Sequence, residues 1–229
     1  MDHVSLVSIK NQSVLRHLNK EEIAYLEKSA EIRSYQKGDI IFSQGRHLTG
    51  CFLVLSGIVK QYKTGAEGRD YILRLAKEFE ILGFRSVMSD EPACNTSTVI
   101  ADSVLCYIPK ECLYHLVKTN GSFALDFLQL TCRELELSNL LMADIAHKSV
   151  KALLAEFLLT LKNKFGLNED GFLNIALSRE DFANIIGTTT ETVIRLLSEF
   201  KAERYIDLSG KKIAITNDKA LEKLATKVK

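Results

Sequence analysis

The feature that most constrains the fold is a pair of helix-start signals separated by a single glycine near the C-terminus. Residues 178–181 (Ser-Arg-Glu-Asp) have the spacing in which a serine caps the free amides of a first helical turn. This helix should run to about Ile186 and stop at Gly187. Residues 188–190, three threonines, should then open a second helix that continues through Phe200. Two short helices joined by a tight turn indicate a helix-turn-helix.

The spacing of three core residues supports this interpretation. Ala183, Gly187 and Val193 stand at the fifth, ninth and fifteenth positions of a 20-residue unit. A helix-turn-helix needs a small residue where its helices touch, a glycine in the turn and a branched core contact from the second helix. We therefore expect these three residues to form the helix-turn-helix core.

The second helix carries two charged groups on one side. Arg195 lies about 40° and Thr188 about 60° from Glu191 around the helix axis. In a DNA major groove, Glu191 could accept a hydrogen bond from cytosine N4, and Arg195 could donate two to guanine O6 and N7. Alternatively, Glu191 and Arg195 could form a surface ion pair, or Glu191 could complete a capping box with Thr188. The opposite side is apolar and consists of Val193, Leu196, Leu197 and Phe200.

The helix-turn-helix is followed by a predicted hairpin. Residues 205–208 and 213–216 have strand character and flank the turn Ser-Gly-Lys-Lys at 209–212. We interpret the hairpin as a wing whose basic tip meets DNA phosphates, although it could be only a solvated turn. The residues expected to contact phosphates are Ser178, Thr188, Thr189, Lys211 and Lys212.

Glycine-punctuated strands dominate residues 31–108. The strand-like segments are 40–42, 51–55, 58–62, 71–75, 97–100 and 104–107, and glycines lie in or beside the gaps. Many short strands at this spacing indicate a sandwich or rolled barrel, for which we expect about eight strands.

A long helix is predicted for residues 120–147, followed by another that ends near Gly166. Most of the long helix is apolar, so it must be covered on more than one side. Leu128, Leu135 and Met142 recur every seven residues, as in a coiled-coil seam, and together with Ile145 they should form a homodimer interface. Burial of the helix within a monomer is the alternative, and Glu134 in the apolar sector counts against the seam.

Composition adds few constraints. The net charge is +1, with −2 over residues 1–147 and +3 over 148–229, which permits a DNA-facing C-terminal part. The five cysteines include no Cys-x-x-Cys pair for zinc or iron–sulfur chemistry, so no cofactor is identified. The N-terminal residues lack a leader pattern and no apolar run approaches the roughly 18 residues of a membrane span, so we expect a cytoplasmic protein without a membrane partner.

From about Ser34 to Asn217 the chain resembles the Crp/Fnr family of bacterial transcription regulators. Residues 37–45 (KGDIIFSQG) and 54–59 (VLSGIV) resemble the first strands of its cyclic-nucleotide-binding-type β-roll, and residues 191–195 (ETVIR) resemble its recognition-helix core. The resemblance implies that Glu191 and Arg195 read bases of an inverted repeat. Thr190 occupies the position of a further base-reading arginine in cyclic-AMP-responsive members, which implies a different target sequence.

The effector site departs from that family's nucleotide-binding pattern. Relatives that bind cyclic nucleotides carry a Gly-Glu pair for the ribose and an Arg-Ser or Arg-Ala pair for the phosphate, whereas the corresponding runs here begin Gly83-Phe84 and Asn95-Thr96. Neither Phe84 nor Asn95 can compensate a phosphate charge as a guanidinium would, so we expect an effector other than a cyclic nucleotide. Arg85 could anchor an anion or lie exposed on a loop. The candidate pocket comprises Gly83, Phe84, Arg85, Asn95, Thr96 and Ser97.

The sequence thus predicts an α+β protein with an N-terminal, jelly-roll-like β-roll (residues 1–119), a long dimerisation helix (120–147) and a C-terminal winged helix-turn-helix (148–229). Its predicted function is that of a sequence-specific transcription regulator whose partners are double-stranded DNA, a second copy of the chain and, for an activator, RNA polymerase. The alternative is a sensor module whose helix-turn-helix docks protein. No nucleophile, metal cluster or phosphate-binding loop indicates an enzyme.

Overall fold

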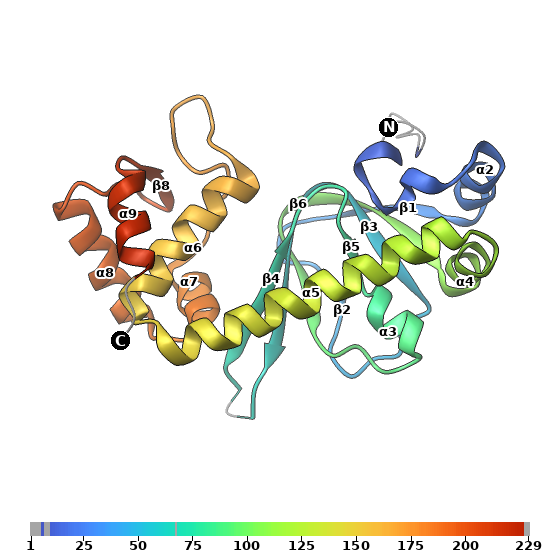
Figure 1. The fold of residues 1–229 in the computed structure, drawn as a ribbon, viewed down its shortest axis with the longest axis horizontal. Coiled ribbons are helices and arrows are strands. Elements are labelled where there is room, and N and C mark those ends of the chain that lie inside the picture. Colours follow the sequence, from blue (N-terminus) through green and yellow to red (C-terminus); the bar gives the residue numbers. More distant parts are fainter. Residues whose placement is uncertain (1–5, 7–9, 67, 227–229) are drawn as a thin grey trace. The chain divides into compact units, whose positions relative to one another are not determined.

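The computed structural model describes residues 6, 10–66 and 68–226 of the chain (Figure 1). These residues belong to two compact units, Met1–Leu135 and Glu136–Lys229. The boundary falls within the longest helix, α5 (Gly121–His147), which occupies the residues where the sequence predicts one long helix. Each unit has its own core and is described separately.

The first unit is a rolled antiparallel sheet with helices before and after it (Figure 1). The sheet follows the order β1-β6-β3-β4, while β2 pairs with β6 and β5 pairs with β3. Its strands are β1 (Glu31–Tyr35), β2 (Ile40–Phe42), β3 (Gly50–Thr64), β4 (Asp70–Ala76), β5 (Ile81–Leu82) and β6 (Thr96–Pro109). Its other elements are η1 (Lys10–Gln12), η2 (Val14–His17), α2 (Lys20–Ser29), α3 (Phe84–Ser89), α4 (Lys110–Thr119) and the start of α5.

The expectation of about eight strands is wrong, because the described part of this sheet has six. Segments 51–55 and 58–62 are one strand, β3, and segments 97–100 and 104–107 are one strand, β6. The pairing of β3 with β6 shifts register on both sides of Gly57. Gly57 has a φ of 91°, so the glycine bends a continuous strand at a bulge and does not end it.

Strand β3 is buried on both faces, which explains its nearly unbroken apolar run. Cys51 and Leu53 pack into a cluster with α2, α4 and the start of α5. Phe52 and Val54 point to the other face and pack into a second cluster inside the roll. Successive side chains of a strand alternate between faces, so this one strand supplies both cores.

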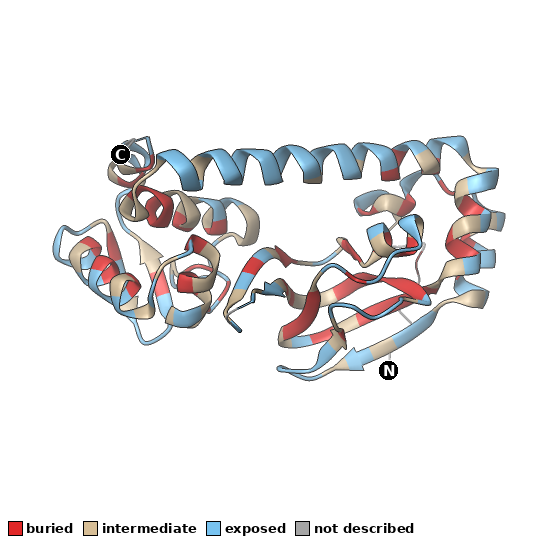
Figure 2. Ribbon diagram, turned by 90° about the horizontal axis from the view of Figure 1, so that it is seen from below, coloured by how far each residue is buried: buried red, intermediate tan, exposed pale blue. Residues whose placement is uncertain are grey.

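Helix α5 is anchored at its start and exposed along most of its remaining length (Figure 2). Phe123 and Phe127 are buried with their rings at 4.9 Å, and Phe84 packs edge-on against Phe127 at 5.4 Å. Asp126 of the same helix is also buried, and it accepts a hydrogen bond from Arg16 Nε at 3.1 Å. No helix within the described ranges combines the length and apolar character that a bilayer crossing needs.

The second unit packs short helices around the apolar side of α8. Its elements after α5 are α6 (Val150–Phe165), α7 (Arg179–Ile186), α8 (Thr190–Ala202), β7 (Ile206–Ser209), β8 (Lys212–Ile215) and α9 (Asp218–Ala225). Phe157 of α6 meets Phe182 of α7 edge-on at 5.5 Å. Lys162 of α6 pairs with Asp218 of α9 at 2.6 Å. The fold class predicted from the sequence, with a β-roll, a long helix and a winged helix-turn-helix, is confirmed.

Replacing Gly57 by Ala should destabilise the first unit by about 2–5 kcal/mol, because positive φ and overpacking add. A Cβ built on Gly57 lies 2.0 Å from Ser103 Oγ and 2.6 Å from the Asp102 carbonyl oxygen. Gly38→Ala is the control, since Gly38 has a φ of 98° with nothing within 4 Å of its added Cβ. The Gly38→Ala variant should lose only about 1–2 kcal/mol of unfolding free energy. Equal urea midpoints for the two variants would contradict the steric argument.

Candidate nucleic-acid interface

Helix α7 begins and ends where local sequence signals predict. Ser178 Oγ accepts a hydrogen bond from the Asp181 amide at 3.0 Å, and the Asp181 carboxylate accepts one from the Ser178 amide at 3.0 Å. This reciprocal capping box satisfies two amides at the start of the helix. The helix ends at Gly187, whose φ of 75° lies in the left-handed region that favours glycine.

The turn leads directly into α8, whose N-cap is Thr189. Thr189 Oγ1 accepts a hydrogen bond from the Thr192 amide at 3.3 Å, and the Thr188 amide closes the turn by donating to the Ala183 carbonyl oxygen. The alternative of a capping box between Thr188 and Glu191 is therefore wrong, because the helix begins one residue later than that box requires.

The two sides of α8 differ sharply in exposure. Val193, Leu196, Leu197 and Phe200 are buried, and Ala183 of α7 is buried opposite them. Glu191 and Arg195 are exposed and Thr190 is half-buried. The apolar side thus holds α8 in the core of the unit and leaves the charged side outward.

Glu191 and Arg195 of α8 do not pair with each other. The Arg195 side chain is 69% exposed, and its ion pair within the described residues is a 4.0 Å contact with Glu199, not with Glu191. Glu199 is also held by Lys151 of α6. Hydrogen bonds from its own backbone amide and from the Thr189 hydroxyl keep the pKa of Glu191 below its usual range, so its carboxylate is an ionised acceptor. The alternative of a Glu191–Arg195 surface pair does not match this geometry.

The predicted wing is the antiparallel hairpin of β7 and β8. Ser209 pairs with Lys212, so Gly210 and Lys211 form the turn, and Gly210 has a φ of 58°. Lys211 and Lys212 are both exposed. At the base of the wing, Lys201 of α8 pairs with Asp207 at 2.8 Å, and the Lys212 ammonium lies 5.9 Å from the Phe172 ring centre. The hairpin therefore carries two exposed lysines near its turn, and contacts with α8 and Phe172 hold its strands.

Arg179 and Lys201 contribute to this surface and were missed by the sequence analysis. Arg179 donates a hydrogen bond from a terminal guanidinium nitrogen to the Gly210 carbonyl oxygen at 3.0 Å. Lys201 donates to the Leu208 carbonyl oxygen at 3.2 Å. The sequence offered one signal for Arg179: a basic residue at the first position of a helix is disfavoured by the positive helix end, so it needs a partner elsewhere.

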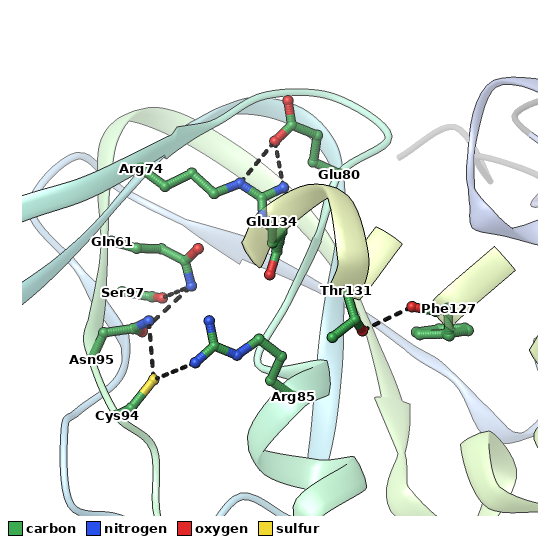
Figure 3. Close-up of polar contacts among 10 residues, drawn as sticks. All are labelled: Gln61, Arg74, Glu80, Arg85, Cys94, Asn95, Ser97, Phe127, Thr131 and Glu134. Carbon is green, nitrogen blue, oxygen red and sulfur yellow. Dashed lines mark hydrogen bonds and ion pairs between the residues drawn. The ribbon is translucent and has the colours of Figure 1, made fainter. Parts of the chain in front are cut away.

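The candidate effector residues lie in the first unit around a polar cluster that Figure 3 shows in detail. Gln61 Nε2 donates to Asn95 Oδ1 at 3.4 Å and to Ser97 Oγ at 3.2 Å. Arg85 donates to Cys94 Sγ at 3.6 Å, and Asn95 donates to the same sulfur at 3.7 Å. Gln61 and Cys94, which the sequence analysis missed, are thus central to the cluster, and its polar groups largely bond one another.

Three other candidate pocket residues have structural roles. Phe84 is 3% exposed and belongs to the core packed against Phe127. Gly83 is the N-cap of α3, with a φ of 76°. Thr96 is buried, and its hydroxyl accepts a hydrogen bond from the Gln44 amide at 3.0 Å. The phenyl ring in particular occupies core space and offers no polar group.

Arg74, also missed from the sequence, holds two carboxylates at the edge of this cluster (Figure 3). Its guanidinium donates to Glu80 Oε2 at 3.2 and 2.6 Å and also pairs with Glu134 of α5. This contact explains the carboxylate in the apolar sector of α5, because Glu134 faces β4. Two carboxylates compensate the one cation, so Arg74 is poorly suited to hold an anionic ligand.

Three of the five thiols are core groups. Cys51, Cys106 and Cys112 are buried, and burial raises the pKa of each. Cys94 and Cys132 are exposed. Within residues 10–66 and 68–226, no group of three or more His, Cys, Asp or Glu side chains is arranged to hold a metal ion.

Comparisons with known proteins agree with both units. The family described as the cyclic nucleotide-binding domain matches residues 32–120, and the family described as the Crp-like helix-turn-helix domain matches residues 154–224. A CRP-like cAMP-activated global transcriptional regulator of Mycobacterium tuberculosis is 24% identical over 93% of this chain and 96% of its own length. The fumarate and nitrate reduction regulatory protein of Vibrio cholerae is 26% identical over 97% of this chain and 90% of its own length.

A solved structure extends this likeness to three dimensions. A protein from Eubacterium rectale, assigned to the Crp/Fnr family of transcriptional regulators, aligns with a TM-score of 0.75 at 26% identity. The alignment covers 93% of this chain and 98% of that protein. Both domain matches, the full-length relatives and the shared fold lead to one assignment: the chain belongs to the Crp/Fnr family of transcription regulators.

Proposed function

We propose that this protein regulates transcription by binding an inverted repeat of double-stranded DNA as a homodimer, with α8 in the major groove. The observation that carries the proposal is the outward display of Glu191 and Arg195 on one side of α8, while the opposite side is buried. An α-helix fits the major groove, where a carboxylate can accept from cytosine N4 and a guanidinium can bind guanine O6 and N7. Thr190, the half-buried first residue of α8, is the third proposed base contact.

Phosphate contacts would place α8 on the duplex. Lys211 and Lys212 are exposed at the wing, and the amide-rich starts of α7 and α8 lie at Ser178 and at Thr188 and Thr189. Ammonium groups and helix N-termini both bind phosphate oxygens. The protein thus acts through binding and not through catalysis, and an activator of this type would also contact RNA polymerase.

The exposed apolar residues of α5 support a homodimer. Leu128, Leu135 and Met142 are 59%, 62% and 62% exposed, and Ile145 is 45% exposed. Their seven-residue spacing suits packing against the same helix of a second copy. Two recognition helices about 34 Å apart would then meet successive major grooves on one side of the duplex.

A selection from random duplexes tests the proposal directly. The purified protein should enrich a two-fold symmetric sequence whose half-sites are centred about one helical turn apart. Recovery of no common sequence, together with binding that is insensitive to salt, would contradict it and would favour a helix-turn-helix that docks protein.

Replacing Arg195 by Ala should relax selectivity at one symmetric base pair, because one good bidentate contact supplies about 1–3 kcal/mol of discrimination. Competition among duplexes that vary at one position measures this. Lys223→Ala, which removes an exposed cation from α9, is the matched control and should leave the preferences unchanged. Unaltered preference at every position in the Arg195 variant would remove this residue from base reading.

Replacing Leu135 by Glu should convert the dimer into monomers, because it would place two carboxylates in the apolar seam. Light scattering gives the mass in solution, and circular dichroism checks that the helix is retained. Gln129→Glu adds the same charge at an exposed position of α5 outside the seam and should leave the dimer intact. A dimeric Leu135 variant would show that the copies associate elsewhere.

We further propose that the effector is not a cyclic nucleotide, because Phe84 is a core residue and Arg74 is compensated by Glu80 and Glu134. Calorimetric titration with cyclic AMP or cyclic GMP should show no saturable binding below about 1 mM. The Arg74 guanidinium is already compensated by two carboxylates, and Asn95 has no positive charge with which to bind the phosphate. Saturable binding that is lost on replacing Arg85 by Ala would contradict this expectation and would assign the phosphate to Arg85.

A further inference from the structure

Arg179 joins the helix-turn-helix to the tip of the wing. It is the first residue of α7, and a terminal guanidinium nitrogen donates to the Gly210 carbonyl oxygen at 3.0 Å. Gly210 and Lys211 form the turn between β7 and β8. The contact therefore links the start of one helix to the turn that carries the wing lysines.

Several features of Arg179 are unfavourable for the local stability of α7. A cation at the first helical position faces the positive end of the helix dipole. Burial of part of the side chain lowers the pKa of the guanidinium, and no carboxylate within the described residues offsets that effect. The other terminal nitrogen is buried without a hydrogen-bond partner in the described structure. The contact with Gly210 is the compensating interaction that the geometry provides.

The base of the wing is fixed by other means. The Leu173 amide donates to the Ile213 carbonyl oxygen at 2.8 Å, and Phe172 forms a β-bridge with Ala214. Lys201 holds Asp207 and Leu208 from α8. Among the described residues, the bond from Arg179 is the one hydrogen bond that reaches the turn from outside the hairpin. A two-stranded hairpin is only marginally stable by itself, so its tip depends on such a link.

We propose that Arg179 is a positioning residue that fixes the wing turn and thereby places Lys211 and Lys212 against DNA phosphates. The inference rests on the proposed DNA-binding function and adds to it the residue that orders the wing. A turn that is already ordered loses less conformational freedom when its lysines bind. Arg179 acts through the wing, so its contribution to binding depends on the lysines.

The test is a double-mutant cycle between Arg179 and the wing lysines. Arg179→Met keeps most of the apolar stem and removes the donor, and it is combined with the paired change Lys211→Ala and Lys212→Ala. Duplex affinity is measured over a range of salt concentrations. Loss of the two lysines should lower the salt slope by up to about two in the wild-type background. In the Arg179→Met background, loss of the two lysines should lower the salt slope by less than about half of the wild-type decrease. Additive losses would overturn the proposal and would indicate a phosphate contact made by Arg179 itself.

A second measurement needs no DNA. Amide hydrogen exchange at Lys211 and Lys212 should be faster in Arg179→Met than in wild type and should be restored partly by Arg179→Lys, which keeps a donor. Lys28→Ala, which removes an exposed cation from α2, controls for net charge and should leave exchange unchanged. Unchanged exchange in Arg179→Met would overturn the proposal, as would faster exchange combined with additive affinity losses.

The two arms separate this inference from the function on which it rests. A wild-type protein that binds no duplex would refute the proposed function and, with it, the role of Arg179 in phosphate binding. Wild-type binding with an additive cycle would refute the role of Arg179 alone. In either case the exchange rates report whether the tether orders the turn.

Discussion

The arrangement of the C-terminal unit depends on the burial of one side of α8. Val193 and Phe200 are fully buried, and the Lys151 ammonium lies 5.8 Å from the Phe200 ring centre while its ion pair with Glu199 ties α6 to α8. A helix held by one side must present the other. The orientation of Glu191 and Arg195 therefore follows from packing that involves neither of them, and the exposed side chains of such a helix can vary without altering the core.

The helix ends of this unit could be predicted because the signals are local. The capping box at Ser178 and the stop at Gly187 involve residues at most four positions apart. The tether from Arg179 to Gly210 spans 31 positions and the pair of Arg74 with Glu134 spans 60, so no window of sequence reveals them. The predicted number of strands was wrong for a related reason, because Gly57 marks a bulge only where β6 approaches it closely. The resemblance to Crp/Fnr regulators located the candidate effector region, but the partners of its side chains depend on packing.

The side-chain contacts of the first unit, and not its fold, limit what could bind there. One relative is named as cAMP-activated, but similarity of fold does not by itself assign a ligand to this chain. In this chain the polar groups of Gln61, Asn95 and Ser97 bond one another, and Arg74 is compensated. A ligand that entered there would have to replace these bonds, and its affinity would be reduced by their loss.

The unequal burial of the thiols has a practical consequence for the chemistry of the purified protein. Thiolates are the reactive form of cysteine, and burial disfavours that form at Cys51, Cys106 and Cys112. A maleimide or alkylating dye applied to the folded protein would attach to Cys94 first, because Cys132 lies beside Leu128 and Leu135 on the side of α5 that the proposed dimer covers. Cys94 lies beside the Gln61 cluster, so a single labelling step gives a fluorescent reporter there without an engineered cysteine.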